Sequence, residues 1–459
     1  MEIKDIKAVY FVGAGGIGMS AIARYFLKKG LVVAGYDKTP TALTRKLEQE
    51  GMSIHYEENV EAIPLACRQP ESCLVVYTPA IPAEHKELKY FSEHNFDIQK
   101  RAQVLGALTR EHKGLCVAGT HGKTTTSTMC AHIMHQSHLD CNAFLGGISK
   151  NYNTNYILSD SDYVVIEADE FDRSFHWLSP YMTVITSTDP DHLDIYGTKE
   201  AYLESFRHYT ELIQPTGAII IHRGLEMKEN LQQGVCRYDY ALTEGDFHAE
   251  NICIENGDIT FDFISPIETV RNIELGQPVP INIENGIAAM AMAQLAGCTA
   301  DELRKGMKTY EGVDRRFDFK IKTSRLVFLS DYAHHPKEIY QSARSIRELY
   351  HDRKITAIFQ PHLYTRTRDF FTEFADALSL LDEVILTEIY PAREEPIEGV
   401  TSQLIYDHLR PGIERHIIRK DEVQQYVRNH DFDVLIVLGA GDLDNQVPQL
   451  TEILKEKLS

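Results

Sequence analysis

The sequence has no basic excess, no cysteine pair of the kind that binds metal, and no apolar run long enough to cross a membrane. Its net charge of −20 and pI near 5.4 exclude a broad cationic surface for nucleic acid or for an acidic membrane. An anionic ligand must therefore be held locally, by glycine loops, metal ions or single arginines. No internal repeat or low-complexity tract is present.

The eight cysteines contain no C-x-x-C pair and no zinc-ligand spacing, which predicts reduced thiols scattered through the core. The N-terminal stretch MEIKDIKAVYFVG lacks the charge and cleavage pattern of a signal peptide. We therefore expect a cytoplasmic protein with neither nucleic-acid nor membrane partners, as a monomer or weak homodimer. A length of 459 residues predicts two or three domains of about 150 residues each.

The motif GTHGKTT joins an apolar strand pattern, residues 115–118, to a helical pattern from residue 125. Gly119 and Gly122 allow backbone amides to converge on an anion at a helix N-terminus, where the helix dipole also favours negative charge. Lys123 would reach the terminal phosphates and the Thr124 hydroxyl would bind magnesium. The stretch is therefore interpreted as a phosphate-binding loop.

This loop departs from the general G-x-x-x-x-G-K-[ST] pattern, because Val117 stands where the first glycine is expected. The alternative is an ordinary strand-to-helix turn with a solvated lysine. The order of strand, glycines, Lys-Thr pair and helix favours phosphate binding.

A second glycine motif, GAGGIG, lies near the N-terminus between the apolar strand AVYFV and a helical segment. Gly13, Gly15 and Gly18 satisfy G-x-G-x-x-G, and Asp37 ends the next strand at the position of a ribose-binding acid. Taken alone, this βαβ pattern indicates a nicotinamide dehydrogenase. A separate phosphate loop later in the chain instead indicates two nucleotide-like ligands.

Two further apolar strands end in acidic clusters, in YVVIEADEFD at 163–172 and in YMTVITSTDPDHLD at 181–194. Ligands of an open parallel sheet lie beyond the carboxyl ends of its strands, where Glu167 and His192 would emerge. Glu167 supplies an oxygen ligand and His192 an imidazole for a phosphate-bound magnesium ion, although both could also cap loops. Short alternating segments at 247–264 predict an edge hairpin or a β-rich excursion of no evident function.

The last third again alternates strands and helices, which predicts a second Rossmann-like sheet. Its strands end in the polar clusters SDYAHHPKE, FQPHLYTRTRDFF, TEIYPAREEP and LGAGD. The motif EGVDRRFD precedes this region, and an arginine there could reach the phosphates.

Together, GAGGIGMSAIA, GTHGKTTT, EADEFD, DPDHLD, GVDRRFD, DYAHHP and QPHLYTRTRDFF resemble the Mur ligases, the ATP-dependent amide ligases of peptidoglycan precursor synthesis. The resemblance spans essentially the whole chain and is greatest to members that join L-alanine to UDP-N-acetylmuramate. It implies a three-domain α/β fold: a Rossmann-like UDP-sugar domain at 1–106, a central P-loop ATPase domain with a mostly parallel sheet at 107–314, and a Rossmann-like ligase domain at 315–459.

The resemblance also implies residue roles. It assigns catalysis to Lys123, His192, His334 and Arg366, and magnesium binding to Thr124, Glu167 and His192. The UDP-sugar would contact Gly13, Gly15, Gly16, Gly18 and Asp37. The implied ATP-binding residues are Gly119, Thr120, His121, Gly122, Lys123, Thr124, Thr125, Asn285, Arg315, Arg316 and Asp331.

Two positions depart from the family pattern. Leu363 stands where many relatives have an arginine that contacts the amino-acid carboxylate. Lys199 follows the metal-binding histidine, but the helix then presents Arg207, so we do not predict a carbamylated lysine.

The implied reaction activates a carboxylate as an acyl phosphate with ATP, after which the amine of L-alanine attacks. His334 or His335 could accept the ammonium proton, although a structural histidine pair fits almost as well. Arg315 and Arg316 would enter the site on domain closure. The alternatives are a recycling ligase that attaches a preformed tripeptide, a dehydrogenase, and a non-catalytic nucleotide sensor.

Overall fold

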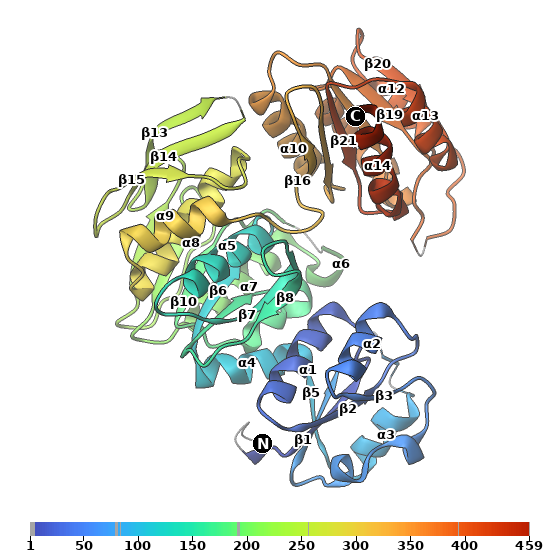
Figure 1. Cartoon of the computed structure of the whole chain (residues 1–459). Coiled ribbons are helices and arrows are strands. Elements are labelled where there is room, and N and C mark those ends of the chain that lie inside the picture. The colour runs from blue at the N-terminus through green and yellow to red at the C-terminus, as the bar shows by residue number, and fades with distance from the viewer. Residues whose placement is uncertain are drawn as a thin grey trace. The chain divides into compact units, whose positions relative to one another are not determined.

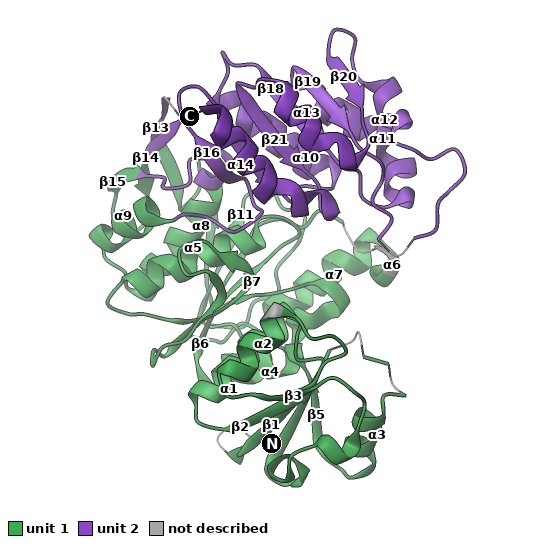
Figure 2. Cartoon of the chain, turned by 45° about the vertical axis from the view of Figure 1, so that its right-hand side comes forward, with its two compact units in different colours: residues 1–250, 261–273, 284–310 green, residues 251–260, 274–283, 311–459 purple. Residues whose placement is uncertain are grey.

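The computed structural model describes residues 5–78, 81–82, 84–190, 193–255, 257–392 and 394–458. The chain divides into two compact units (Figure 2). Unit 1 comprises residues 1–250, 261–273 and 284–310, and unit 2 comprises 251–260, 274–283 and 311–459.

The first sheet of unit 1 has the strand order β3-β2-β1-β4-β5, and all of its pairings are parallel (Figure 1). The strands are β1 (Ala8–Val12), β2 (Val32–Tyr36), β3 (Ser53–His55), β4 (Cys73–Tyr77) and β5 (Asp97–Lys100). The helices are α1 (Ile17–Lys28), α2 (Ala42–Gln49), α3 (Lys86–Glu93) and α4 (Arg101–Glu111).

Strand β1 is buried on both faces, as expected for a central strand of a parallel sheet. Its side chains alternate between the faces, so Val9 and Phe11 join the hydrophobic cluster that contains Ile22 of α1. Tyr10 joins a second cluster with Phe91 of α3. The sheet is thus covered by helices on both sides.

The second sheet of unit 1 has the order β12-β11-β10-β6-β9-β7-β8. Its pairings are parallel except for the antiparallel pair of β7 and β8. The strands are β6 (Lys113–Ala118), β7 (Asn142–Ser149), β8 (Thr154–Ile157), β9 (Tyr163–Glu167), β10 (Met182–Ile185), β11 (Ala218–His222) and β12 (Cys236–Tyr240). The helices are α5 (Lys123–Gln136), α6 (Leu193–Tyr196), α7 (Lys199–Glu211), α8 (Ile281–Ala296) and α9 (Ala300–Thr309).

The predicted β-rich excursion is confirmed as a separate three-stranded sheet, with the order β13-β14-β15. Its strands are β13 (His248–Glu255), β14 (Asp258–Ile264) and β15 (Val270–Glu274).

Unit 2 contains a six-stranded sheet with the order β16-β17-β21-β18-β19-β20. Only its edge pair of β16 and β17 is antiparallel. The strands are β16 (Asp318–Lys322), β17 (Val327–Asp331), β18 (Ile355–Phe359), β19 (Glu383–Leu386), β20 (Glu414–Ile417) and β21 (Val434–Leu438). The helices are α10 (Pro336–Leu349), α11 (Tyr364–Leu378), α12 (Gln403–His408), α13 (Val423–Asn429) and α14 (Val447–Leu458).

Short 3-10 helices complete the chain. They are η2 (Val60–Ala62), η3 (Leu65–Arg68), η4 (Phe171–Trp177), η5 (Lys420–Glu422) and η6 (Asp442–Gln446).

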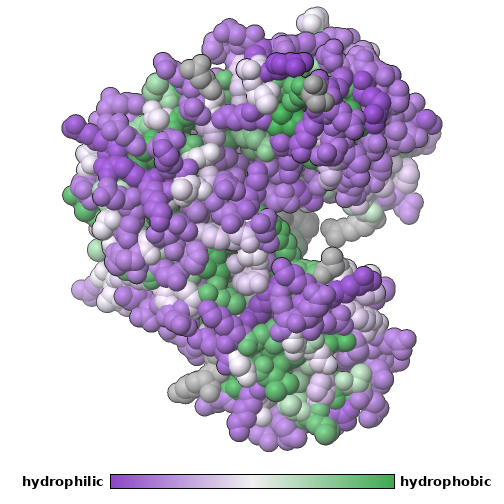
Figure 3. All heavy atoms as spheres, in the orientation of Figure 1, coloured by the Kyte–Doolittle hydropathy of each residue, from purple (hydrophilic) through white to green (hydrophobic). Residues whose placement is uncertain are grey.

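The cysteine prediction is confirmed for six thiols, which are buried and free, but Cys236 and Cys253 are exposed. Both exposed thiols lie on strands with an open face, which a count of spacings does not reveal. Among the described residues, no helix is both long enough and apolar enough to span a membrane. Hydrophilic side chains cover most of the face shown in Figure 3.

Candidate active site

The phosphate loop lies between β6 and α5 and depends on two glycines with positive φ. Gly119 has φ +133° and Gly122 has φ +80°. A Cβ atom on Gly119 would lie 2.1 Å from the Thr186 hydroxyl, so no side chain fits there. Helix α5 begins at Lys123, two residues before the predicted start.

The segment after β10 holds this loop in place. The amide of His121 donates to the Ser187 hydroxyl at 2.8 Å, and the Thr186 hydroxyl donates to the His121 carbonyl at 2.5 Å. The Thr120 hydroxyl donates to the Asp189 carbonyl at 2.7 Å. Residues 186–189 thus support the loop, a role that the sequence interpretation missed.

Lys123 is folded back onto the loop and onto an acid. Its Nζ donates to the Gly119 carbonyl at 2.6 Å and to Oε1 of Glu170 at 2.9 Å. The second Glu170 oxygen lies 2.8 Å from Nζ, and only 2% of the Glu170 side chain is exposed. The sequence interpretation chose Glu167 from the cluster EADEFD and missed Glu170.

Burial and charge oppose each other in this ion pair. Burial favours neutral Lys123, but the carboxylates of Glu170 and Glu167 prevail and raise the pKa of Lys123. Burial raises the pKa of Glu170, and the attraction of Lys123 offsets this only in part. Lys123 therefore carries its charge in a site with little water.

The predicted magnesium ligands are placed in part. Thr124 lies in the first turn of α5, and Glu167 is the last residue of β9. The Glu167 carboxylate occupies space left by Gly146, where a Cβ atom would lie 2.3 Å from Oε2. His192 lies outside the described residues. A hydroxyl and a carboxylate are hard oxygen donors, so this donor set fits magnesium.

Asn285 of α8, a predicted ATP contact, lies beside the phosphate loop. Its Oδ1 accepts a hydrogen bond from the Thr126 hydroxyl at 3.2 Å. A Cβ atom on Gly122 would lie 2.8 Å from the same oxygen. The side chain therefore lies against the N-terminus of α5.

The N-terminal glycine loop is closed by an acid of its own domain. The Gly15 amide donates to Oδ2 of Asp37 at 2.6 Å, and the Thr39 amide donates to Oδ1 at 3.1 Å. Gly13 has φ +91°, and Gly16 is the N-cap of α1. Asp37 thus orders the loop directly.

Arg101 is a residue that sequence reasoning missed at this loop. Its guanidinium lies over Gly18, where a Cβ atom would come 2.3 Å from the nearest nitrogen. Gly18 is therefore needed for the approach of an arginine that lies 83 residues further along the chain. A cation beside the first turn of α1 favours an anionic ligand.

The two sheets of unit 1 are tied together next to the glycine loop. Buried Asn155 of β8 donates to the carbonyl of Ile17, the first residue of α1, at 2.9 Å. Arg24 of α1 lies 5.0 Å from the ring centre of Tyr156. Both contacts fix α1 against the central sheet.

In unit 2, predicted residues gather at the carboxyl end of β17. Asp331 is the last residue of that strand and accepts a short hydrogen bond from the Ser342 hydroxyl. Burial raises the pKa of Asp331, and the Ser342 hydrogen bond opposes that shift. His334 follows, with Nδ1 3.0 Å from the Tyr332 carbonyl, and burial lowers its pKa. His335 caps α10.

The paired arginines of GVDRRFD flank Tyr332. Their guanidinium carbons lie 4.6 Å and 5.5 Å from its ring centre, for Arg315 and Arg316 respectively. Arg315 pairs with Asp444 at 2.9 Å, and Arg316 lies 3.9 Å from Glu338. Arg315 has φ +63°, so the motif forms a tight turn.

Arg366 lies beside a second histidine. Its Nη1 is 3.3 Å from Nδ1 of His362, and the His362 and His334 rings are 5.7 Å apart. Burial, together with the electrostatic influence of neighbouring His334 and Arg366, lowers the pKa of His362 to about 4. Leu363, the departure from the family pattern, has φ +71° and precedes α11.

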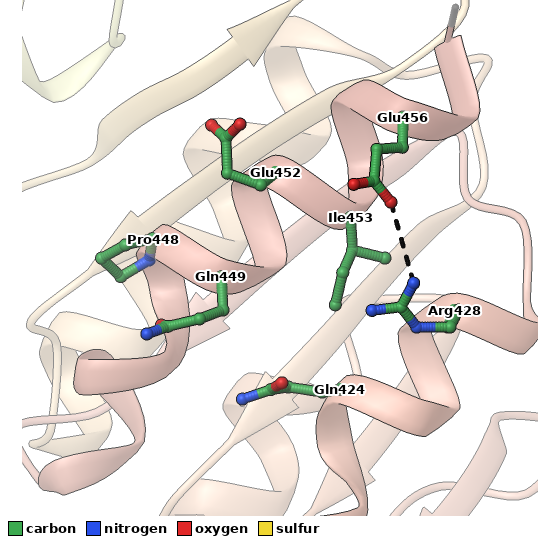
Figure 4. A pocket seen from close by; sticks show the side chains of 7 residues that line it. All are labelled: Gln424, Arg428, Pro448, Gln449, Glu452, Ile453 and Glu456. Carbon is green, nitrogen blue, oxygen red and sulfur yellow. Dashed lines mark ion pairs between the residues drawn. The ribbon is translucent and has the colours of Figure 1, made fainter.

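A surface hollow of about 430 Å³ also occurs in unit 2 (Figure 4). It lies between α13 and α14 and contains the Arg428 to Glu456 ion pair. None of its lining residues is a predicted site residue. They are Gln424, Arg428, Pro448, Gln449, Glu452, Ile453 and Glu456.

A phosphate loop on a parallel sheet, with Lys123 facing an acidic strand end, defines a P-loop nucleotide-binding protein with an added Rossmann-like sheet. Family models support a narrower assignment. "Mur ligase family, catalytic domain" matches residues 8–113, "Mur ligase middle domain" 117–293, and "Mur ligase, glutamate ligase domain" 315–441.

Whole-chain relatives agree with the family models. The UDP-N-acetylmuramate–L-alanine ligase of Phocaeicola vulgatus is 66% identical, over 100% of both chains. That of Parabacteroides distasonis is 58% identical, over 100% of this chain and 99% of the relative. The crystal structure of UDP-N-acetylmuramate-alanine ligase from Thermotoga maritima superimposes with a TM-score of 0.80 at 26% identity, covering 98% of this chain and 99% of that one.

The chain belongs to the Mur ligase family, and it is an ATP-dependent amide ligase of the ADP-forming class. The structural match confirms the predicted three-domain α/β fold class. The predicted dehydrogenase alternative gives no account of the phosphate loop.

Proposed function

We propose that the chain joins L-alanine to the lactyl carboxylate of UDP-N-acetylmuramate, with release of ADP and phosphate. The observation that carries this proposal is the 66% identity, over the full length, to a protein named for that reaction. The product would be a precursor of peptidoglycan. We further propose a cytoplasmic enzyme that acts as a monomer or weak homodimer on these small molecules alone.

We propose domain limits at 1–106, 107–314 and 315–459. The sheets support them, because the first sheet ends at Lys100, the second begins at Lys113, and the last begins at Asp318. The UDP-sugar would bind at Gly13, Gly15, Gly16 and Gly18 and near Asp37. ATP would bind the phosphate loop, with Asn285, Arg315, Arg316 and Asp331 as further contacts.

In the first step, the substrate carboxylate attacks the γ-phosphorus of ATP and ADP leaves, which gives an acyl phosphate. Lys123 and the loop amides from Gly119 to Thr125 would neutralise the charge that develops on the transferred group. Thr124, Glu167 and His192 would hold magnesium, which supplies further neutralisation of the phosphates. Catalysis in this step is positioning and electrostatics.

In the second step, the amine of L-alanine attacks the acyl carbon and phosphate leaves. His334 is our candidate base, because burial lowers its pKa and so favours the neutral imidazole that can accept a proton. Arg366 would orient the amino acid. No arginine is available at Leu363, so Arg366 is the candidate for the alanine carboxylate.

The decisive experiment measures phosphate release from ATP with UDP-N-acetylmuramate and a panel of acceptors. The panel contains L-alanine, glycine, L-serine and the recycling tripeptide. Turnover with L-alanine that exceeds all the others supports the proposal. A preference for the tripeptide would establish the recycling ligase instead, and release without any acceptor would contradict the ligase mechanism.

A further inference from the structure

The ammonium group of Lys123 has a full set of protein partners. Its three N–H groups face the Gly119 carbonyl at 2.6 Å, the Thr120 carbonyl at 3.5 Å and the Glu170 carboxylate at 2.9 Å. Two of these contacts are short and the third is long, so most of the hydrogen-bonding capacity of the ammonium is used within the protein. Nucleotide binding must therefore exchange at least one of these partners.

Glu170 is held rigidly against Lys123. Its carbonyl accepts hydrogen bonds from the Tyr196 hydroxyl at 2.5 Å and from the Arg173 amide at 2.9 Å. Asp172 and Arg173 have φ of 47° and 61°, so a strained turn fixes the backbone directly after Glu170.

The phosphate loop is held beside Glu170 by a neighbouring tyrosine. The Tyr202 hydroxyl lies 2.8 Å from the Thr120 hydroxyl, and the Tyr196 and Tyr202 rings are 4.9 Å apart. The acid and the loop are thus positioned by adjacent helices, α6 and α7.

We propose that Glu170 is a positioning residue that holds Lys123 retracted on the phosphate loop until the nucleotide phosphates replace its carboxylate as the counter-ion. The proposal rests on the proposed binding of ATP at this loop. Two anions that share one ammonium repel each other strongly at a site where 2% of the acid is exposed. The phosphates displace the carboxylate, because they also accept hydrogen bonds from the loop amides.

The test compares nucleotide binding by the full-length wild type and Glu170→Gln, with ADP and a non-hydrolysable ATP analogue in a calorimeter. Glutamine keeps the shape of the side chain and removes its charge, so Lys123 is released for phosphate. We expect the Kd to fall about tenfold, because a charged competitor is removed from a charge-assisted contact. In Glu170→Gln, the fold decrease in the KM for ATP should exceed the fold change in kcat.

Four further proteins make the result specific. Glu170→Asp keeps the charge but shortens the reach to Nζ, and its Kd should lie between those of the wild type and Glu170→Gln. In the Lys123→Met background, Glu170→Gln should no longer tighten binding. Glu383→Gln removes another buried acid, paired with Lys354 at 2.9 Å in unit 2, and should leave the Kd unchanged.

Folding of each variant is checked by its Tm. If Glu170→Gln is unfolded, Glu170→Asp and its KM for ATP carry the test. An unchanged or weaker affinity in folded Glu170 variants overturns this proposal alone. Absence of nucleotide binding by the wild type overturns the proposed function and this proposal together.

Discussion

Unit 1 contains the sequence of strand, glycine turn and helix twice. A carboxylate lies against the first turn, whereas an ammonium group lies against the second. In the N-terminal turn, the Gly15 amide already binds the Asp37 carboxylate. In the phosphate loop, the Gly119 carbonyl instead accepts a hydrogen bond from the Lys123 ammonium. Similar backbones can therefore hold different parts of a nucleotide-like ligand, because the nearby charged side chain decides which groups remain available.

The largest expected effect comes from removing the cation of the phosphate loop. Lys123→Met should lower kcat/KM for ATP by about 10³-fold, because it removes charge stabilisation from the transferred phosphoryl group. Phosphate release at varied ATP measures the effect. The control is Lys455→Met, which removes an exposed lysine of α14 and should leave turnover intact. Comparable losses in both variants would show that the phosphate loop has no special role.

Alanine at one glycine of each turn should separate the two ligands. Gly119→Ala forces a side chain into the Thr186 hydroxyl, and Gly15→Ala places one 2.8 Å from Oδ2 of Asp37. Each substitution should introduce about 1–3 kcal/mol of strain. We therefore expect the KM for ATP to rise roughly 10- to 100-fold in Gly119→Ala, and the KM for the UDP-sugar to rise by a similar factor in Gly15→Ala. Initial rates with each substrate varied in turn measure both. The prediction fails if either variant affects the other substrate more.

Asp37→Asn tests the acid that closes the N-terminal turn. It weakens a charge-assisted hydrogen bond to the Gly15 amide by about 1–2 kcal/mol, so the KM for the UDP-sugar should rise about tenfold. The KM for ATP should stay within about twofold of the wild-type value, because the N-terminal turn and the phosphate loop are expected to act as independent sites. An equal rise for both substrates would indicate general destabilisation of unit 1.

The last prediction concerns the stability of the helix behind the phosphate loop. Helix α5 buries His132, whose ring nitrogens lie 2.7 Å and 2.9 Å from the Tyr152 and Thr309 hydroxyls. Burial, with the charges of His135 and Lys305, lowers the pKa of His132 to about 4. Because the folded state favours neutral imidazole, this histidine stabilises the fold above its ordinary pKa, near 6.5, and the stabilisation is lost as pH falls towards 4.

Urea denaturation at pH 7.5 and pH 4.5 measures this contribution. The wild type should lose about 2 kcal/mol more than His132→Gln across that interval. His208→Gln, at a half-exposed histidine of α7, is the matched control and should follow the wild type. If the wild type and His132→Gln lose the same free energy of unfolding between pH 7.5 and pH 4.5, His132 is not the source of the pH dependence.

The sequence predicted the features that depend on the residues of one short segment. Short continuous apolar runs predicted β1, β2, β6, β9 and β10, and the glycine spacing placed both turns. Short polar elements such as β5, with the sequence DIQK, carry no such pattern and were not predicted.

Contacts between residues that are far apart along the chain could not be predicted from the sequence. The cluster EADEFD offers four acids, and spacing does not tell which carboxylate meets Lys123. That choice follows from the turn after β9, where Asp172 and Arg173 take positive φ. Likewise, Gly18 matched a nucleotide motif, but its contact with Arg101 depends on how α4 packs.

The two exposed thiols make the chain ready for fluorescence measurements without engineered cysteines. Cys236 belongs to unit 1 and Cys253 to unit 2, whereas the other six cysteines are buried. Both thiols lie between residues 107 and 314, so maleimide dyes would label the proposed central domain alone and leave the buried cysteines unreacted. A change in dye fluorescence on addition of ATP would then report on that domain directly.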